Sequence, residues 1–167
     1  QNGKRFISGE ESRRREDPPA ERRSEPVRSY WYRRRQQMRT TAIKLEKDKF
    51  EEISGLVKDA VQASGIVNGA CIVTVSDPAA GLAYLEEGNE AAMNDIAAEL
   101  ARVFPPRVDY KSGGDAYVCS ARTKAALLCM SKECAIVDGK AEFGKERGLY
   151  AVHFLGSDTA QICIQCI

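Results

Sequence analysis

Histidine is almost absent from this sequence, which has a single His and a single Trp among 167 residues. One imidazole cannot form the clustered-histidine sites that bind catalytic zinc, and no other members of a Ser-His-Asp triad are evident around it. Long apolar runs are lacking too. No stretch approaches the roughly 20 residues of a membrane helix, and none resembling a secretory signal precedes the cysteines. Phosphate-binding and dinucleotide-binding glycine motifs are also missing. We therefore expect a cytosolic protein with no membrane span and no cofactor.

Charge divides the chain into two parts. Residues 1–37 hold eleven Lys or Arg against six Asp or Glu, whereas residues 38–167 hold fourteen against eighteen. The first part repeats Arg, Glu, Ser and Pro, and it offers little apolar surface to offset the entropy of folding. We predict a disordered tail over 1–37 and one domain over 38–167, a length typical of a single domain. Two readings of the tail stay open: native sequence, or sequence upstream of a true start at Met38.

Aromatic and basic residues meet at the end of the tail, where Tyr30-Trp31-Tyr32 precedes Arg33-Arg34-Arg35. Aromatic side chains stack on bases and arginines bind phosphates, so an RNA-binding arm is one alternative. A solvated linker is favoured, because short basic clusters are common and have little specificity. Nucleic acid is therefore not the expected partner.

Apolar periodicity predicts strands and helices mixed along the domain. Strands are expected over 40–45, 70–75, 81–85, 134–137, 141–154 (with a break near 144–148) and 159–167. Helical spacing predicts helices over 50–61, from an Asn89 cap to Pro105, and over 121–128. The inward face of the second helix is expected to consist of Ala92, Ile96, Ala97 and Leu100. Gly65 is expected to end the first helix and Asp138-Gly139 to form a hairpin turn. These elements indicate an α+β fold, with helices packed on a largely antiparallel β-sheet.

All six cysteines lie in the domain: Cys71, Cys119, Cys129, Cys134, Cys163 and Cys166. Most are flanked by Ile, Val, Leu or Ala, where a free thiol behaves as a small buried hydrophobe. Cys163 and Cys166 have the spacing of a redox or zinc motif, but residues three apart on a strand face opposite sides. Cys129 and Cys134 flank a loop and are the better pair. Without a second pair nearby, no metal site is predicted.

A spaced set of residues carries a family resemblance. It begins with Gly65-Ile66-Val67-Asn68-Gly69, a buried strand, Leu82, Glu86 and Asp95. It continues with Lys124-Ala125, Asp138-Gly139, Gly144, Gly148, Tyr150, Phe154 and Gly156. Across residues 40–167 this order resembles the YjbQ-like family, also called the secondary thiamine-phosphate synthase family. The resemblance implies a single α+β domain, a homotrimer and a weak thiamine-phosphate-forming activity.

The resemblance also implies a site with three histidines, and here the chain departs from the family pattern. The histidine of a His-Thr-Thr-Ala segment becomes Asp77 in Asp77-Pro78-Ala79-Ala80, the second falls near Ser112, and the third is Arg122. Glu86 keeps the family's glutamate. A closing Glu-Phe-Asp-Gly-Pro-Arg becomes His153-Phe154-Leu155-Gly156-Ser157-Asp158. The family-site positions are therefore Asp77, Glu86, Ser112 and Arg122, and they predict a degenerate site.

The remaining groups allow two kinds of chemistry. Arg122 and Lys124, near Gly113-Gly114, can hold a phosphate or carboxylate, unless they are two solvated cations on a short helix. Asp77 and Glu86 can form an acid/base pair, although exposed strand ends are favoured for both. His153 is expected to be structural or exposed. No metal is expected, because a guanidinium at position 122 repels a bound cation.

Three hypotheses follow. The leading one is a cytosolic YjbQ-like homotrimer with a degenerate site, either noncatalytic or binding a small phosphate-bearing ligand. The second is a weak thiamine-phosphate synthase-type enzyme, and enzymatic activity is left undecided with a lean toward none. The third is a trimeric scaffold with a basic RNA-binding arm.

Overall fold

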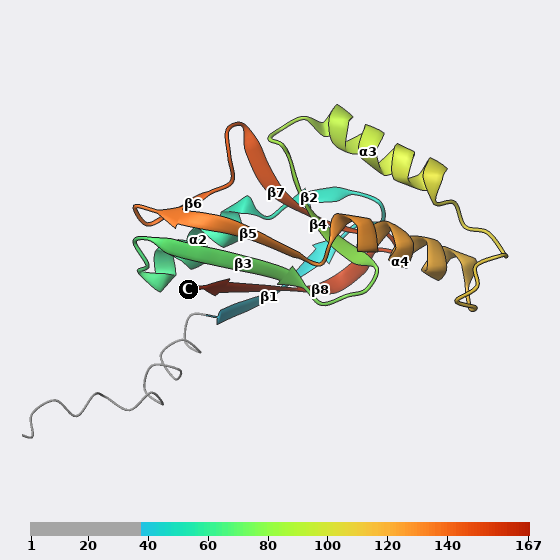
Figure 1. Ribbon diagram of the computed structural model, residues 1–167, viewed down its shortest axis with the longest axis horizontal. Helices are drawn as coiled ribbons and strands as arrows, with labels where there is room; N and C mark the ends of the chain where they lie inside the picture. Colours follow the sequence, from blue (N-terminus) through green and yellow to red (C-terminus); the bar gives the residue numbers. More distant parts are fainter. Residues whose placement is uncertain (1–37) are drawn as a thin grey trace, which may run out of the picture.

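The computed structural model describes residues 38–167, which form two antiparallel sheets with helices packed against them (Figure 1). The larger sheet has the order β1 (Met38–Leu45), β8 (Ser157–Cys166), β3 (Gly69–Val75), β5 (Ser131–Val137), β6 (Lys140–Glu142). The smaller sheet has the order β2 (Phe50–Glu52), β7 (Arg147–His153), β4 (Ala80–Glu86). The predicted α+β class is confirmed, with two sheets in place of one. The predicted disordered tail lies outside the described residues.

The main core lies between the two sheets and takes in one face of helix α2 (Ser54–Ser64). Val57 and Val61, one helical turn apart, are both almost fully buried there. Inward residues of both sheets complete this core; its largest members are Leu45, Leu82, Ile136, Leu149, Ile162 and Ile164. Burying each such side chain stabilises the fold by about 1.5–3 kcal/mol. The core therefore fixes the ends of β4 and β7 relative to the larger sheet.

A second, smaller core lies on the other face of the smaller sheet, under helix α4 (Ala116–Leu128). It contains Ala79, Ala121, Ala125, Val152 and Phe154. Gly81 on β4 allows the helix to approach, because a Cβ there would lie 2.8 Å from the Cβ of Leu128. The sequence thus places α4 directly over the start of β4 and the end of β7.

Helix α3 (Glu90–Val103) is the least packed element and stands away from both sheets in Figure 1. Met93 is its one buried residue. The predicted inward residues (Ala92, Ile96, Ala97, Leu100) are only half-buried. The predicted Asn89 cap is confirmed, because its side chain accepts the N–H of Ala92 at 3.0 Å.

Two predicted helix starts are wrong, for different reasons. Phe50 belongs to strand β2, where it pairs with Val152, and α2 begins only at Ser54. The apparent helical stripe therefore joined residues that pack in different cores. Helix α4 begins at Ala116 and not at 121, because Asp115 caps it through the N–H groups of Tyr117 and Val118.

The turn predictions are confirmed by positive φ angles. Gly65 ends α2 at φ 67°, and Asp138-Gly139 joins β5 to β6 with φ 49° and 74°. Within residues 38–167, no helix combines the length and the apolar composition that crossing a membrane requires.

Candidate functional site

The single histidine, His153, is the last residue of β7 and lies at one end of the main core. Its backbone carbonyl accepts the N–H of Asp48 at 3.1 Å and that of Gly156 at 3.2 Å. Its side chain is on the same face of the strand as Leu149 and Ala151, both core residues, and is 4% exposed. Of the two expectations for this residue, exposed is therefore wrong. The fold holds the imidazole inside the protein.

The imidazole has one defined hydrogen bond. The N–H of Leu155 donates to Nδ1 of His153 at 3.2 Å, so Nδ1 carries no proton and the neutral ring has its proton on Nε2. Nε2 lies 3.2 Å from Oδ1 of Asp77. That contact is short but poorly aligned, and Nε2 has no well-formed hydrogen-bond partner among the described residues. The Nε2–H group therefore faces a carboxylate and has no lone pair to offer a substrate.

Asp77 lies in the turn between β3 and β4, and its side chain stabilises that turn. Its Oδ1 accepts the N–H of Ala79 at 2.8 Å, and its side chain is 41% exposed. Partial burial raises the pKa of Asp77, but the Ala79 N–H, His153 and the positive charge of Arg122 together lower it below its ordinary value. Asp77 is thus an ionised carboxylate with its other oxygen available to solvent.

Lys124 of α4 is the buried cation of this region, 6% exposed. Its Nζ lies 3.7 Å from Oδ1 of Asp48 and 5.3 Å from the centre of the Phe154 ring. Asp48 sits in the left-handed backbone region, with φ 58°. The solvated alternative for Lys124 is therefore wrong, because the β1–β2 connection and Phe154 cover its amine. We call Asp48, Asp77, Arg122, Lys124 and His153 the Asp77–His153 cluster.

The glycine loop before α4 contacts Cys119 of that helix. Gly113 O accepts the S–H of Cys119, and Ser112 Oγ lies 3.3 Å from the same sulfur. The first N–H groups of α4, which would otherwise attract an anion, are already bound by the carboxylate of Asp115. Of the predicted anion site of Arg122, Lys124, Gly113 and Gly114, Lys124 is buried beside Asp48, whereas the other three residues are exposed. Arg122 is the exposed cation of this set.

Glu86 is at the far end of β4 from Asp77. The strand between them spans seven residues, which is roughly 20 Å at the rise of an extended chain. Glu86 instead accepts a hydrogen bond from Nδ2 of Asn89 at 2.9 Å. The structure therefore does not bring the predicted acid/base pair together, and Asp77 meets His153 in place of Glu86.

The cysteines follow the alternation expected of strands. Cys166 is buried in the main core, whereas Cys163 is half-buried and points to the other face of β8. Cys129 is exposed and Cys134 is buried. All six are free thiols, and no group of three or more potential metal ligands is present in residues 38–167.

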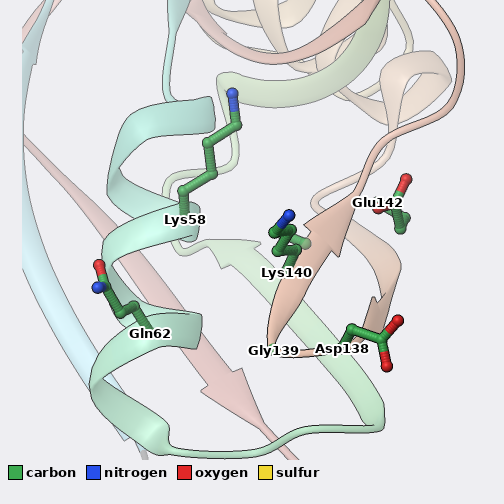
Figure 2. A pocket seen from close by; sticks show the side chains of 7 residues that line it. Lys58, Gln62, Asp138, Gly139, Lys140 and Glu142 are labelled. Carbon is green, nitrogen blue, oxygen red and sulfur yellow. The ribbon is translucent and has the colours of Figure 1, made fainter.

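An open cavity lies away from this cluster, between α2 and the β5–β6 hairpin (Figure 2). Its volume is about 470 Å³. Lys58 and Gln62 line it from α2 and Lys140 from the hairpin, whereas the carboxylates of Asp138 and Glu142 point away from the helix. This hairpin is at the opposite end of β3 from Asp77. A second groove, of about 320 Å³, runs along α3 between Ile96, Leu100 and Phe104.

The Asp77–His153 contact was missed at the sequence level, because 75 other residues separate the two in the chain. A signal existed: Asp77 precedes β4 and His153 ends β7, and these strands pair antiparallel with Ala80 opposite His153. Predicting that pairing would have placed the two side chains together.

Comparisons with known proteins agree on one family. The model of the family described as "UPF0047 protein YjbQ-like" matches residues 39–167. An uncharacterised conserved protein of the YjbQ/UPF0047 family from Clostridium acetobutylicum is 30% identical, with a TM-score of 0.71 over 77% of this chain and 99% of its own. A YbjQ-like protein of unknown function from Sulfolobus solfataricus is 20% identical, with a TM-score of 0.71 over 77% and 94%. The latter supports the fold alone. Among curated proteins, none matches the chain.

Proposed function

The chain belongs to the UPF0047 YjbQ-like family, and on that premise we propose that it is a noncatalytic member that binds a small phosphate-bearing ligand beside Asp77. The observation that carries this proposal is the state of the single imidazole. His153 is buried, its Nδ1 accepts the N–H of Leu155, and its Nε2–H faces Asp77. A general base needs a free lone pair within reach of the substrate proton, and this ring offers none.

The other reactive groups are also used within the fold. Lys124 is covered by Asp48 and Phe154, and Asp77 is kept ionised by Ala79, His153 and Arg122. These contacts within the fold support the degenerate-site hypothesis, in which the family's histidines at positions 77, 112 and 122 have been replaced. The cluster is also a poor site for a divalent metal. Its imidazole carries a proton on Nε2, and its two carboxylates lie beside two cations.

Arg122 is the group that supports an anionic ligand. It is exposed on α4, close enough to Asp77 to affect its pKa, and its planar guanidinium suits two oxygens of one phosphate. A ligand carrying both a phosphate and a hydrogen-bond donor fits best, because Asp77 accepts beside Arg122. Inorganic phosphate, a dianion without such a donor, fits less well because the negative charge of Asp77 repels it.

The test is titration calorimetry with inorganic phosphate and with thiamine phosphate. We expect thiamine phosphate to bind, and the Arg122→Ala variant to weaken binding at least about tenfold, which is the loss of one charge-assisted hydrogen-bond pair. Arg107→Ala is the matched control, because Arg107 is an exposed arginine paired with Asp109 and distant in sequence from Asp77. Equal binding by both variants would contradict the proposed site.

A second candidate function, weak thiamine-phosphate synthase-type catalysis, is supported by the 3.2 Å approach of His153 to Asp77. A carboxylate oriented by an imidazole can act as a base through its free oxygen. A turnover assay separates the two candidates. Activity that is lost in both Asp77→Asn and His153→Asn would favour the enzyme, whereas binding without turnover would favour the binding protein.

We further propose that the chain assembles as a homotrimer in the cytosol, as the leading hypothesis has it. The half-exposed apolar face of α3 supports a partner surface, and six free thiols fit a reducing compartment. The RNA-binding arm concerns residues 1–37 and remains a third proposal. It is tested by comparing salt-dependent RNA binding with and without those residues.

A further inference from the structure

Three of the six cysteines form a row across neighbouring strands of the larger sheet. Cys71 on β3 is directly opposite Cys134 on β5 and directly opposite Cys166 on β8. Figure 1 shows these three strands side by side. All three side chains face the main core, with exposures of 0%, 7% and 1%. Cys71 therefore has a thiol neighbour on each side.

The hydrogen-bond ladder defines the geometry of the pair formed by Cys71 and Cys166. Ala70 and Ile167 exchange two backbone hydrogen bonds, of 2.9 and 2.8 Å. Because pairs in an antiparallel ladder alternate, the adjacent Cys71–Cys166 pair is not hydrogen-bonded and its side chains lie closer together. Such pairs have Cα atoms about 4.5 Å apart, which is within the range of about 4.4–6.8 Å for disulfides.

The same alternation applies on the other side of Cys71. Val75 donates its N–H to Met130 O at 2.9 Å, so the odd-numbered residues of β3 bond to β5 and Cys71–Cys134 is a hydrogen-bonded pair. Its Cα atoms are then about 5.5 Å apart, also within disulfide range. A disulfide can thus form on either side of Cys71 without moving the strands.

The three thiols differ in reactivity. Contact with Cys71 lowers the pKa of Cys134 although burial opposes it. Contact with Cys134 and burial raise the pKa of Cys71. Cys134 is also the most exposed of the three. Since the thiolate is the nucleophile, Cys134 is the thiol that reacts first.

We propose that Cys134, Cys71 and Cys166 form a thiol–disulfide site that reacts with hydrogen peroxide. The Cys134 thiolate attacks one peroxide oxygen, the O–O bond breaks and hydroxide leaves, giving a sulfenic acid. The Cys71 sulfur attacks the sulfenic sulfur and water leaves, forming the Cys71–Cys134 disulfide. Cys166 then attacks the Cys71 sulfur and Cys134 departs as the thiolate. In sum, two thiols and one peroxide give one disulfide and two waters.

Peroxide reaches Cys134 at its exposed edge, since it is 7% exposed, and the Cys71–Cys166 pair lies near the end of its own ladder. Only the Ala70–Ile167 pair lies beyond Cys71–Cys166 in the β3–β8 ladder. Opening that end pair costs less than unfolding the sheet, because ladder ends open locally. The competing explanation is that the cysteines are small apolar residues of the core, equivalent to Val73 or Ile164 on the same strands. Oxidation of the folded chain distinguishes the two explanations.

The experiment uses the full 167-residue chain with Cys119, Cys129 and Cys163 changed to Ser, treated with hydrogen peroxide while folded and mapped by mass spectrometry. We expect one disulfide, between Cys71 and Cys166, reversed by dithiothreitol, and a thermal midpoint several degrees higher when oxidised. Cys134→Ala should slow its formation about tenfold, because the most ionised thiol is lost.

Two results would overturn the proposal: a disulfide that forms only after denaturation, or one that persists in Cys71→Ala. A product that stays at Cys71–Cys134 would overturn the exchange step. Cys71→Val serves as a second variant if Cys71→Ala does not fold. Mapping the parent chain tests the proposal even if neither variant folds.

Discussion

Helices α2 and α3 are both amphipathic, yet they differ in what covers their apolar faces. α2 buries four residues, Ser54, Val57, Ala60 and Val61, against strands of both sheets. α3 is longer but buries Met93 alone, and its apolar groove stays open. An amphipathic pattern shows that a helix face needs a partner, but it does not show whether that partner belongs to the same chain. For α2 the partner is intramolecular, and for α3 we propose a second copy.

The largest expected effect is a truncation in the core that covers α2. Leu149→Ala removes a fully buried side chain and should lower the free energy of unfolding by about 2–5 kcal/mol. Leu100→Ala on α3, only half-buried, is the matched change and should cost less than half as much. Urea unfolding at equal protein concentration measures both. Equal losses would mean that α3 is packed as firmly as α2.

A polar contact at the start of α2 should have the next largest effect. Ser54 is 1% exposed, and its Oγ accepts the N–H of Leu149 at 2.9 Å. Ser54→Ala leaves that N–H buried without a partner, which costs about 1–3 kcal/mol of unfolding free energy. Ser76→Ala, at an exposed serine after β3, is the control. If both variants unfold at the same urea concentration, the contact is not structural.

A smaller effect is expected from Asp77 as the pH falls. Its pKa in the folded chain lies below the ordinary value of 3.8, so its charge stabilises the fold above that pH and the contribution is lost as the pH falls through the folded pKa. Because Asp77 is 41% exposed, the contribution is below about 1 kcal/mol.

Asp77→Asn keeps an acceptor for the Ala79 N–H and removes the charge. Its unfolding free energy should therefore fall less than that of the parent chain between pH 5 and pH 2. Chemical unfolding at several pH values measures the difference. A steeper fall in the variant would reverse the sign and contradict the assigned contacts.

The smallest effect on folding, and a large one on assembly, is expected from Val103→Glu, because Val103 is 52% exposed and lines the groove along α3. Sedimentation of a chain that begins at Met38 should show a trimer, and the variant should be a monomer. Its monomer unfolding free energy should change by no more than about 0.5 kcal/mol, as for other surface substitutions. A parent chain that is monomeric at micromolar concentration would remove the proposed role of α3.

Local signals in the sequence predicted much of the fold, because caps and turns depend on neighbouring residues. Gly65, Asn89 and Asp138-Gly139 are examples, since each acts through its own φ angle or side chain. The division into two sheets was not predictable in this way. It depends on strand pairs such as β2 with β7, which join residues about a hundred positions apart. Phe50 was misassigned for the same reason.

The sequence predicted which positions belong to the candidate site, but not which of their side chains contact one another. The resemblance gave Asp77 and Arg122, which do influence each other, and it gave Glu86, which lies at the other end of β4. The sequence left His153 as structural or exposed and Lys124 as an anion ligand or a solvated cation, whereas the fold buries both. Their burial comes from long-range packing against Phe154, Asp48 and Asp77, which no local pattern encodes.

The protonation state of His153 tests the central claim most directly. Because the chain has a single histidine, ¹⁵N NMR of the folded protein gives one imidazole to assign. The account predicts the Nε2–H tautomer at neutral pH, with Nδ1 as the acceptor, and nitrogen shifts that do not change when zinc is added. An Nδ1–H tautomer, or a shift of Nε2 on adding zinc, would contradict it and would indicate a working imidazole at this site.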